Sequence, residues 1–203
     1  MVSVPSEQLR APLALKIVIA GGFGVGKTTT VASISEIEPL TTEAALTDVS
    51  VGIDRVDFTP DKTETTAALD FGRITLADDL VLYLFGTPGQ QRFAFMWDEL
   101  ARGAVGAIIV ADTRRLAESF PAISYFERRN LPFAIGVNCF DGVCRYSVEQ
   151  VREAVAVRDD VPVVLFDARE RSSVKETLAV LVQYSLERAR AELASSASGP
   201  SAS

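Results

Sequence analysis

Residues 21–28 read GGFGVGKT and match the pattern G-x-x-x-x-G-K-[ST]. The apolar stretch 13–20 precedes the motif and predicts a buried strand, and residues 29–38 can continue as a helix. Glycines let the backbone take turns that a side chain would block, so that several N–H groups can point at one polyphosphate. The sequence therefore predicts a phosphate-binding loop of the kind found in nucleotide-hydrolysing proteins, rather than a glycine-rich turn without a ligand.

The last two residues of this loop, Lys27 and Thr28, have distinct predicted roles. Lys27 can reach the β- and γ-phosphates, and the Thr28 hydroxyl can ligate Mg²⁺. The following helix N-terminus adds partial positive charge. The candidate phosphate contacts are Gly21, Gly22, Phe23, Gly24, Val25, Gly26, Lys27, Thr28 and Thr29.

Composition excludes several function classes. The 203 residues contain no histidine, which excludes histidine-based acid–base catalysis and Ser-His-Asp triads. The net charge of −7 argues against nucleic acid or an anionic membrane as the main partner. We see no signal peptide, lipid-anchor motif or apolar stretch of membrane-spanning length, so we expect a cytoplasmic protein that a partner can recruit to a membrane.

The two cysteines, Cys139 and Cys144, have no further cysteine or histidine with which to form a zinc site. A disulfide between them is the less favoured alternative. We expect two reduced thiols, as in most cytosolic proteins.

Apolar runs alternate with helical patterns, which predicts an α/β fold with a six-stranded, mostly parallel sheet and helices on both faces. The expected strands are 14–20, 67–76, 80–85, 105–111, 133–137 and 163–166, the second and third forming a hairpin. The expected helices are 27–37, 94–101, 114–129, 147–157 and 174–192. Residues 38–66 show no clear period. We expect a flexible N-terminus (1–12), one domain (13–193) and a disordered tail (194–203).

The segment 137–141, VNCFD, follows the fifth expected strand, where open α/β sheets bind ligands. Its N-x-x-D resembles the N-K-x-D base-recognition motif of small GTPases. The Asp141 carboxylate can accept both guanine donors, N1–H and the 2-amino group, whereas adenine leaves it unpaired. Asn138 would contact the base edge and brace the phosphate loop. Cys139 replaces the lysine that covers the base in that family.

The segment 84–93, LFGTPGQQRF, resembles the D-x-x-G-Q switch of Ras-like GTPases. Gly89 matches the glycine whose N–H meets the γ-phosphate, and Gln90 matches the glutamine that orients the attacking water. Gly86 stands where the family has its Walker-B aspartate. The absence of that carboxylate puts tight metal binding in doubt.

T-P-G-Q at this place resembles the bacterial MglA-type small GTPases. Together with GGFGVGKTT, MWDEL, GAIIVADTRR, NCFDG and DAR, the chain resembles the GTP-binding member of actinobacterial conservon operons still more closely. The resemblance implies a Ras-like G domain, GTP or GDP with Mg²⁺ as cofactors, and a roadblock-type partner protein. It also implies a signalling switch with slow hydrolysis.

The same resemblance assigns three further site residues. Thr66 aligns best with the switch threonine that ligates Mg²⁺, with Thr65 as a close competitor. Ala168 falls where a backbone N–H contacts guanine O6, and Arg169 follows it. Lys27, Thr66 and Gln90 would therefore form the catalytic set, with Thr28 and Thr66 on the metal.

Two other functions remain open at this stage. Gly86 and Cys139 also fit a pseudo-GTPase that holds nucleotide only as an assembly element. Alternatively, Asp112 ends an apolar strand pattern and could act as the Walker-B aspartate of a P-loop ATPase. Asp70 belongs to a D-F-G triplet that, without a kinase catalytic loop, we interpret as part of a strand.

Overall fold

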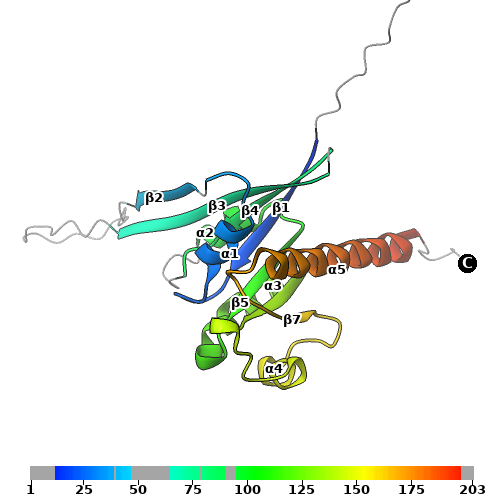
Figure 1. Ribbon diagram of the computed structural model, residues 1–203. Helices are drawn as coiled ribbons and strands as arrows, with labels where there is room; N and C mark the ends of the chain where they lie inside the picture. Colours follow the sequence, from blue (N-terminus) through cyan, green and yellow to red (C-terminus); the bar gives the residue numbers. More distant parts are fainter. Residues whose placement is uncertain (1–11, 39, 47–64, 78, 90–94, 198–203) are drawn as a thin grey trace, which may run out of the picture.

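A single mixed sheet organises the molecule. The computed structural model describes residues 12–38, 40–46, 65–77, 79–89 and 95–197. Within these residues the sheet has seven strands in the order β2-β3-β4-β1-β5-β6-β7 (Figure 1). The bounds are β1 Leu13–Ala20, β2 Leu40–Leu46, β3 Thr65–Ala77, β4 Leu80–Gly86, β5 Gly106–Ala111, β6 Phe133–Asn138 and β7 Val163–Phe166. Strands β4, β1, β5, β6 and β7 are parallel, whereas β2 and β3 pair antiparallel.

Helices cover both faces of this sheet. Their bounds are α1 Lys27–Ile34, α2 Met96–Ala101, α3 Phe120–Arg128, α4 Val148–Val155 and α5 Arg171–Ala197, with 3₁₀ turns at Thr113–Ser119 (η2) and Phe140–Gly142 (η3). Ile17 and Ile19 point toward α1 and α5, while Val18 and Ala20 pack on the side of α2, α3 and α4. The alternation follows from the two-residue period of a strand. The α/β class and the layering predicted above are confirmed.

Strand β2 is the element that corrects the prediction of six strands. Its sequence, LTTEAAL, has no sustained apolar alternation. Among the described residues it is an edge strand and pairs with β3 alone, from Leu40↔Phe71 to Leu46↔Thr65. This segment is a strand because its backbone pairs with β3, and not because its own sequence has a hydrophobic pattern. The hairpin of β3 and β4 was predicted correctly.

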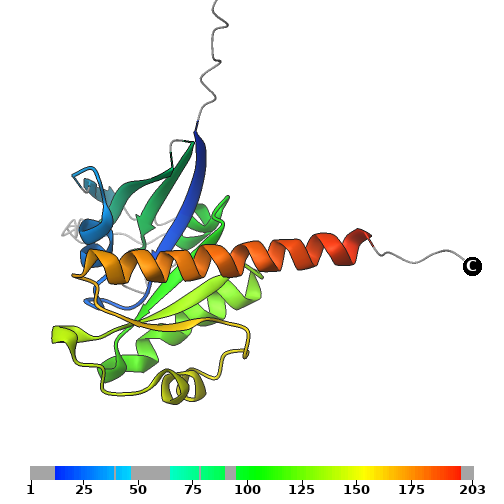
Figure 2. The ribbon, with the colours of Figure 1, turned by 45° about the vertical axis from the view of Figure 1, so that its right-hand side comes forward.

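Helix α5 is longer than its apolar pattern indicated. It continues to Ala197, so the expected tail at 194–203 does not begin at residue 194. The hydroxyls of Ser195 and Ser196 donate to the Glu192 and Leu193 carbonyl oxygens, which lets serines remain in the last turn. Figure 2 shows α5 crossing the sheet face and continuing past it. No helix among the described residues is long and apolar enough to span a membrane.

The topology brings several loops to one edge of the sheet. The phosphate loop follows β1, and residues 87–89 follow β4, which lies beside β1. The segments that follow β5, β6 and β7 begin at the same edge, because these strands are parallel to β1. In open α/β sheets this carboxyl edge holds the ligand.

Candidate nucleotide-binding site

The phosphate loop (residues 21–28) takes the turns that its glycines predict. Gly21, Gly24 and Gly26 all have positive φ, at 137°, 69° and 109°. Gly26 is the residue from which α1 starts. The loop therefore leads directly into a helix N-terminus, where backbone N–H groups and the helix dipole favour an anion.

Lys27 is buried within this loop. Its Nζ donates to the Gly21 and Gly22 carbonyl oxygens at 3.1 and 2.5 Å. Burial lowers the pKa of Lys27 from 10.5 to about 8, against the opposing effects of Asp70 and Glu118. Without an anion the site thus disfavours the charged ammonium, and a bound phosphate would reverse that effect.

Asp70 supplies a carboxylate to the phosphate loop. It lies on β3, is only 7% exposed, and accepts a hydrogen bond of 2.7 Å from the Thr28 hydroxyl. The sequence interpretation of Asp70 as a strand residue is correct, but it missed this contact. Asp70 is 42 residues from Thr28, and no local motif links the two.

Gly86 explains how this carboxylate enters the site. Asp70 and Gly86 are register partners across β3 and β4. A Cβ on Gly86 would lie 2.9 Å from Asp70 Oδ2 and 3.0 Å from Asp70 Cβ. Gly86 on β4 has no side chain, and this leaves the space that the Asp70 carboxylate of β3 occupies. A carboxylate therefore lies beside the Thr28 hydroxyl although β4 has a glycine at this position.

A cavity of about 320 Å³ lies over the phosphate loop. Gly89 closes one side, since a Cβ there would lie 2.8 Å from Phe23 Cα and 2.9 Å from Lys27 Nζ. Thr87 Oγ1 is buried and has no hydrogen-bond partner among the described residues. The lining comprises Phe23, Gly24, Gly26, Lys27, Thr28, Thr29, Asp70, Thr87, Pro88 and Gly89. An unpaired hydroxyl, a buried lysine and a threonine–carboxylate pair suit an oxyanion and a hard cation.

Asn138 ties the base segment to the phosphate loop, as predicted. Its Nδ2 donates to the Val25 carbonyl oxygen at 3.0 Å, and its Oδ1 accepts from the Ala168 N–H at 3.1 Å. Asn138 is buried at the end of β6. The Ala168 N–H, expected to face guanine O6, is thus engaged by Asn138 in this structure.

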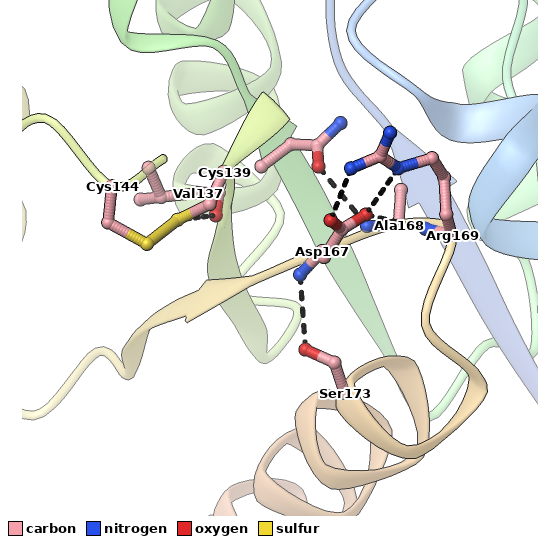
Figure 3. Close-up of a disulfide and its surroundings, with 8 residues drawn as sticks. Val137, Cys139, Cys144, Asp167, Ala168, Arg169 and Ser173 are labelled. Atoms are coloured by element: carbon pink, nitrogen blue, oxygen red, sulfur yellow. Dashed lines mark hydrogen bonds and ion pairs between the residues drawn. A yellow bond between two sulfur atoms is a disulfide. The ribbon is translucent and has the colours of Figure 1, made fainter. Parts of the chain in front are cut away.

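Asp141 and Arg169 form an ion pair near the end of β6. Arg169 Nη1 lies 3.1 Å from Asp141 Oδ1, and the Asp141 side chain is 88% exposed. Arg169 also binds Asp167 through Nε and Nη2 at 3.0 and 2.7 Å (Figure 3). These hydrogen bonds hold the pKa of the Asp167 carboxyl below its usual value. Asp141 is therefore exposed, paired by a displaceable surface ion pair, and open to a ligand.

Asp112 is paired with arginine side chains. It is 2% exposed, caps η2 and is bound by Arg114 through the backbone N–H and the guanidinium. The Arg114 guanidinium lies 4.1 Å above the Phe140 ring. Asp70, not Asp112, accepts the hydrogen bond of the Thr28 hydroxyl.

Arg115 is a cation that sequence reasoning passed over. Its Nη2 donates to the Phe23 carbonyl oxygen at 3.0 Å, and its Nη1 pairs with Glu118 at 3.2 Å. Its backbone leaves helical geometry at φ −142° and ψ 44°. This kink interrupts the helix predicted for residues 114–129.

Cys139 and Cys144 form a disulfide, which overturns the expectation of two reduced thiols (Figure 3). Their Cα atoms lie 4.8 Å apart, within the range that a disulfide bridges. The 3₁₀ turn at Phe140–Gly142 and the positive φ of Asp141 and Gly142 bring the two residues together. A spacing of four intervening residues does not by itself reveal this turn.

Two predicted catalytic positions are not placed. Gln90 lies outside the described residues. Thr66 belongs to β3 and pairs with Ala45, but its side chain is not described. Among nearby aromatic residues, Trp97 packs in the core whereas Phe95 is 62% exposed.

The sequence matches one protein family and a relative from an archaeon. A family model described as "Conserved hypothetical ATP binding protein" matches residues 19–188. This chain belongs to that family. The uncharacterized protein MJ1339 of Methanocaldococcus jannaschii is 30% identical over 129 residues, which span 63% of this chain and 71% of the relative.

Solved structures show the same architecture. The G domain of the T. maritima FeoB iron transporter has a TM-score of 0.58 at 18% identity, covering 85% of this chain and 99% of that domain. The cytosolic domain of FeoB in a GDP form has a TM-score of 0.61 at 15% identity, covering 87% of this chain and 65% of that one. Family and fold together support a nucleotide-binding P-loop protein with a G-domain fold. The narrower MglA-type and conservon resemblance stays a prediction.

Proposed function

We propose that this chain is a guanine-nucleotide-binding switch that hydrolyses GTP slowly. The observation that carries the proposal is the position of Asn138. This buried side chain bonds the phosphate loop on one side and the Ala168 backbone on the other. It thereby holds the segment of Asp141 next to the loop that would bind the phosphates.

The phosphate side of the site fits a triphosphate with Mg²⁺. Lys27 would neutralise β- and γ-phosphate charge, and the Thr28 hydroxyl with the Asp70 carboxylate would hold the metal directly or through water. When bound, Mg²⁺ would neutralise charge that develops on the phosphate oxygens. Thr66 remains the proposed second hydroxyl ligand.

Residues 87–89 would report the nucleotide state. Gly89 lies against Phe23 and Lys27, and its N–H would meet the γ-phosphate. Gln90, the next residue, would orient the attacking water. Loss of the γ-phosphate would release this segment and change the surface offered to a partner, for which we propose a roadblock-type protein.

Guanine is favoured over adenine by the chemistry of Asp141. A carboxylate pairs with the two adjacent donors of guanine, whereas adenine presents an acceptor there. Guanine would replace Arg169 as the partner of Asp141, at a small cost because this ion pair is exposed to solvent. The family description favours ATP as the second candidate ligand. Cys139, in place of the base-covering lysine, favours a third possibility, in which the protein binds a nucleotide without effective turnover.

Asp141→Asn tests the base assignment. An amide offers a donor where guanine also has one, so GDP affinity should fall at least tenfold while xanthosine diphosphate gains. Competition against a fluorescent guanine nucleotide measures both. Unchanged GDP affinity in this variant would remove Asp141 from the base site.

Lys27→Ala and Gln90→Leu separate binding from hydrolysis. The first should abolish triphosphate binding, because it removes the cation of the phosphate loop. The second should retain GTP binding but slow single-turnover phosphate release. If no phosphate is released by the unaltered protein with Mg²⁺, with or without a roadblock-type partner, the protein is a binding element and not a hydrolase.

A further inference from the structure

The disulfide lies inside the segment that would recognise the base. Cys139 is the residue between Asn138 and the turn that carries Asp141, and Cys144 follows three residues after Asp141. We call residues 138–144 the base loop. Figure 3 shows the sulfur–sulfur bond beside the end of β6 and close to the segment of Asp167 and Arg169.

The two cysteine residues differ in their exposure to solvent. Cys139 is 5% exposed, and its N–H donates to the Phe166 carbonyl oxygen at 2.7 Å, so it is anchored in the sheet. Cys144 belongs to a run of exposed residues from Asp141 to Ser147. A soluble thiol would therefore attack at Cys144, the exposed residue, with Cys139 as the leaving group.

The bond closes a ring that contains Asp141. Asp141 and Gly142 have positive φ values of 58° and 71°, a conformation that an open chain seldom keeps at an aspartate. Two backbone hydrogen bonds of 3.1 Å complete the turn: the Gly142 N–H donates to the Cys139 carbonyl oxygen, and the Val143 N–H donates to the Phe140 carbonyl oxygen. Covalent closure reduces the number of conformations open to this loop and so pre-organises the carboxylate.

We propose that Cys139–Cys144 is a thiol–disulfide exchange site whose oxidised form holds the base loop ready for guanine. This inference rests on the proposed guanine-binding function. The co-reactant is a dithiol. Its thiolate attacks the Cys144 sulfur and Cys139 leaves as a thiolate, which takes up a proton. The second dithiol sulfur then attacks the mixed disulfide and releases Cys144. Two electrons and two protons pass to the protein, and the dithiol becomes a disulfide.

The test measures GDP affinity in both redox states. Full-length protein purified without reductant is titrated with fluorescent GDP before and after treatment with dithiothreitol, and a thiol count checks each state. The count should rise from zero to two per chain. GDP affinity should fall about tenfold, because an unclosed loop spends a smaller fraction of time in the binding conformation.

Cys144→Ser is the matched control, because it alters an exposed side chain and leaves the buried Cys139 in place. This variant should bind GDP as weakly as the reduced protein and should not respond to dithiothreitol. Equal GDP affinity in both redox states, or two free thiols in the untreated protein, overturns the inference alone. If neither state binds a guanine nucleotide, the proposed function is overturned and this inference with it.

Discussion

Asp70 shows how one carboxylate can reach the phosphate loop from a strand other than the one that follows the usual motif. Its Oδ2 accepts the Thr28 hydroxyl at 2.7 Å, and Gly86 on β4 leaves room for it. The chemical requirement is an oxygen ligand near the threonine, and the sheet register meets it from β3. Sequence motifs record the usual strand, whereas the proposed metal site would depend only on where the carboxylate oxygen lies.

Asp70→Asn should weaken the effect of Mg²⁺ on nucleotide binding. Asparagine keeps an acceptor for Thr28 but lacks the negative charge that holds a divalent cation. We expect the ratio of GDP affinities with Mg²⁺ and with a chelator to fall about tenfold. Titration under both conditions measures it.

Asp112→Asn is the control for that change, since Asp112 is also a buried aspartate but binds Arg114. Its Mg²⁺ ratio should match that of the unaltered protein. The opposite result, with only Asp112→Asn losing the Mg²⁺ effect, would support the ATPase arrangement.

The lowered pKa of Lys27 predicts that GDP affinity depends on pH. Its pKa in the free protein is lowered to about 8, and bound phosphates favour the charged form. As pH rises through about 8 the free protein loses the proton that binding needs, so affinity falls. Between about pH 7 and 8.5 we expect a loss of about fourfold in GDP affinity. A constant affinity over this range would show that Lys27 keeps its ordinary pKa.

At the scale of elements, Asn138 connects β6, the phosphate loop and the turn after β7. Asn138→Ala removes two hydrogen bonds and leaves the Val25 carbonyl and the Ala168 N–H buried without partners. The cost should be about 2–4 kcal/mol in the free energy of unfolding. Urea denaturation of the nucleotide-free protein measures it.

Asp141→Asn is a matched change on the same loop. Its side chain is exposed, and asparagine tolerates the positive φ of this position. Its stability should stay within about 0.5 kcal/mol of the unaltered protein. Equal destabilisation by the two substitutions would mean that Asn138 is not the residue that joins these elements.

Elements with their own apolar pattern could be predicted from the sequence. The strand pattern at 105–111 matches β5, whose six residues are all buried. Strand β2 could not be predicted, because its partner β3 supplies the hydrogen bonds and its sequence carries no alternation. The last turn of α5 was missed for a related reason, since serine hydroxyls bonded to the helix backbone are indistinguishable in sequence from those of a polar tail.

At the scale of the whole molecule, the candidate site could be predicted where contacts are local or follow parallel strands. The phosphate loop and Asn138 meet because β1, β5 and β6 end at one edge. The contacts of Asp70 and Arg115 with the loop could not be predicted. Asp70 reaches it through the pairing register of β3 and β4, and Arg115 through the kink in η2. The disulfide was missed because it depends on a turn with positive φ.

The central claim is that the assembled site selects guanine through Asp141. Calorimetric titration of the nucleotide-free, oxidised protein with GDP and with ADP, both with Mg²⁺, tests it most directly. We predict that GDP binds at least about 100-fold more tightly, as expected when a polar site discriminates by paired donors and acceptors. Equal binding of the two nucleotides, or tighter binding of ADP, would contradict the claim and favour an ATP-binding protein.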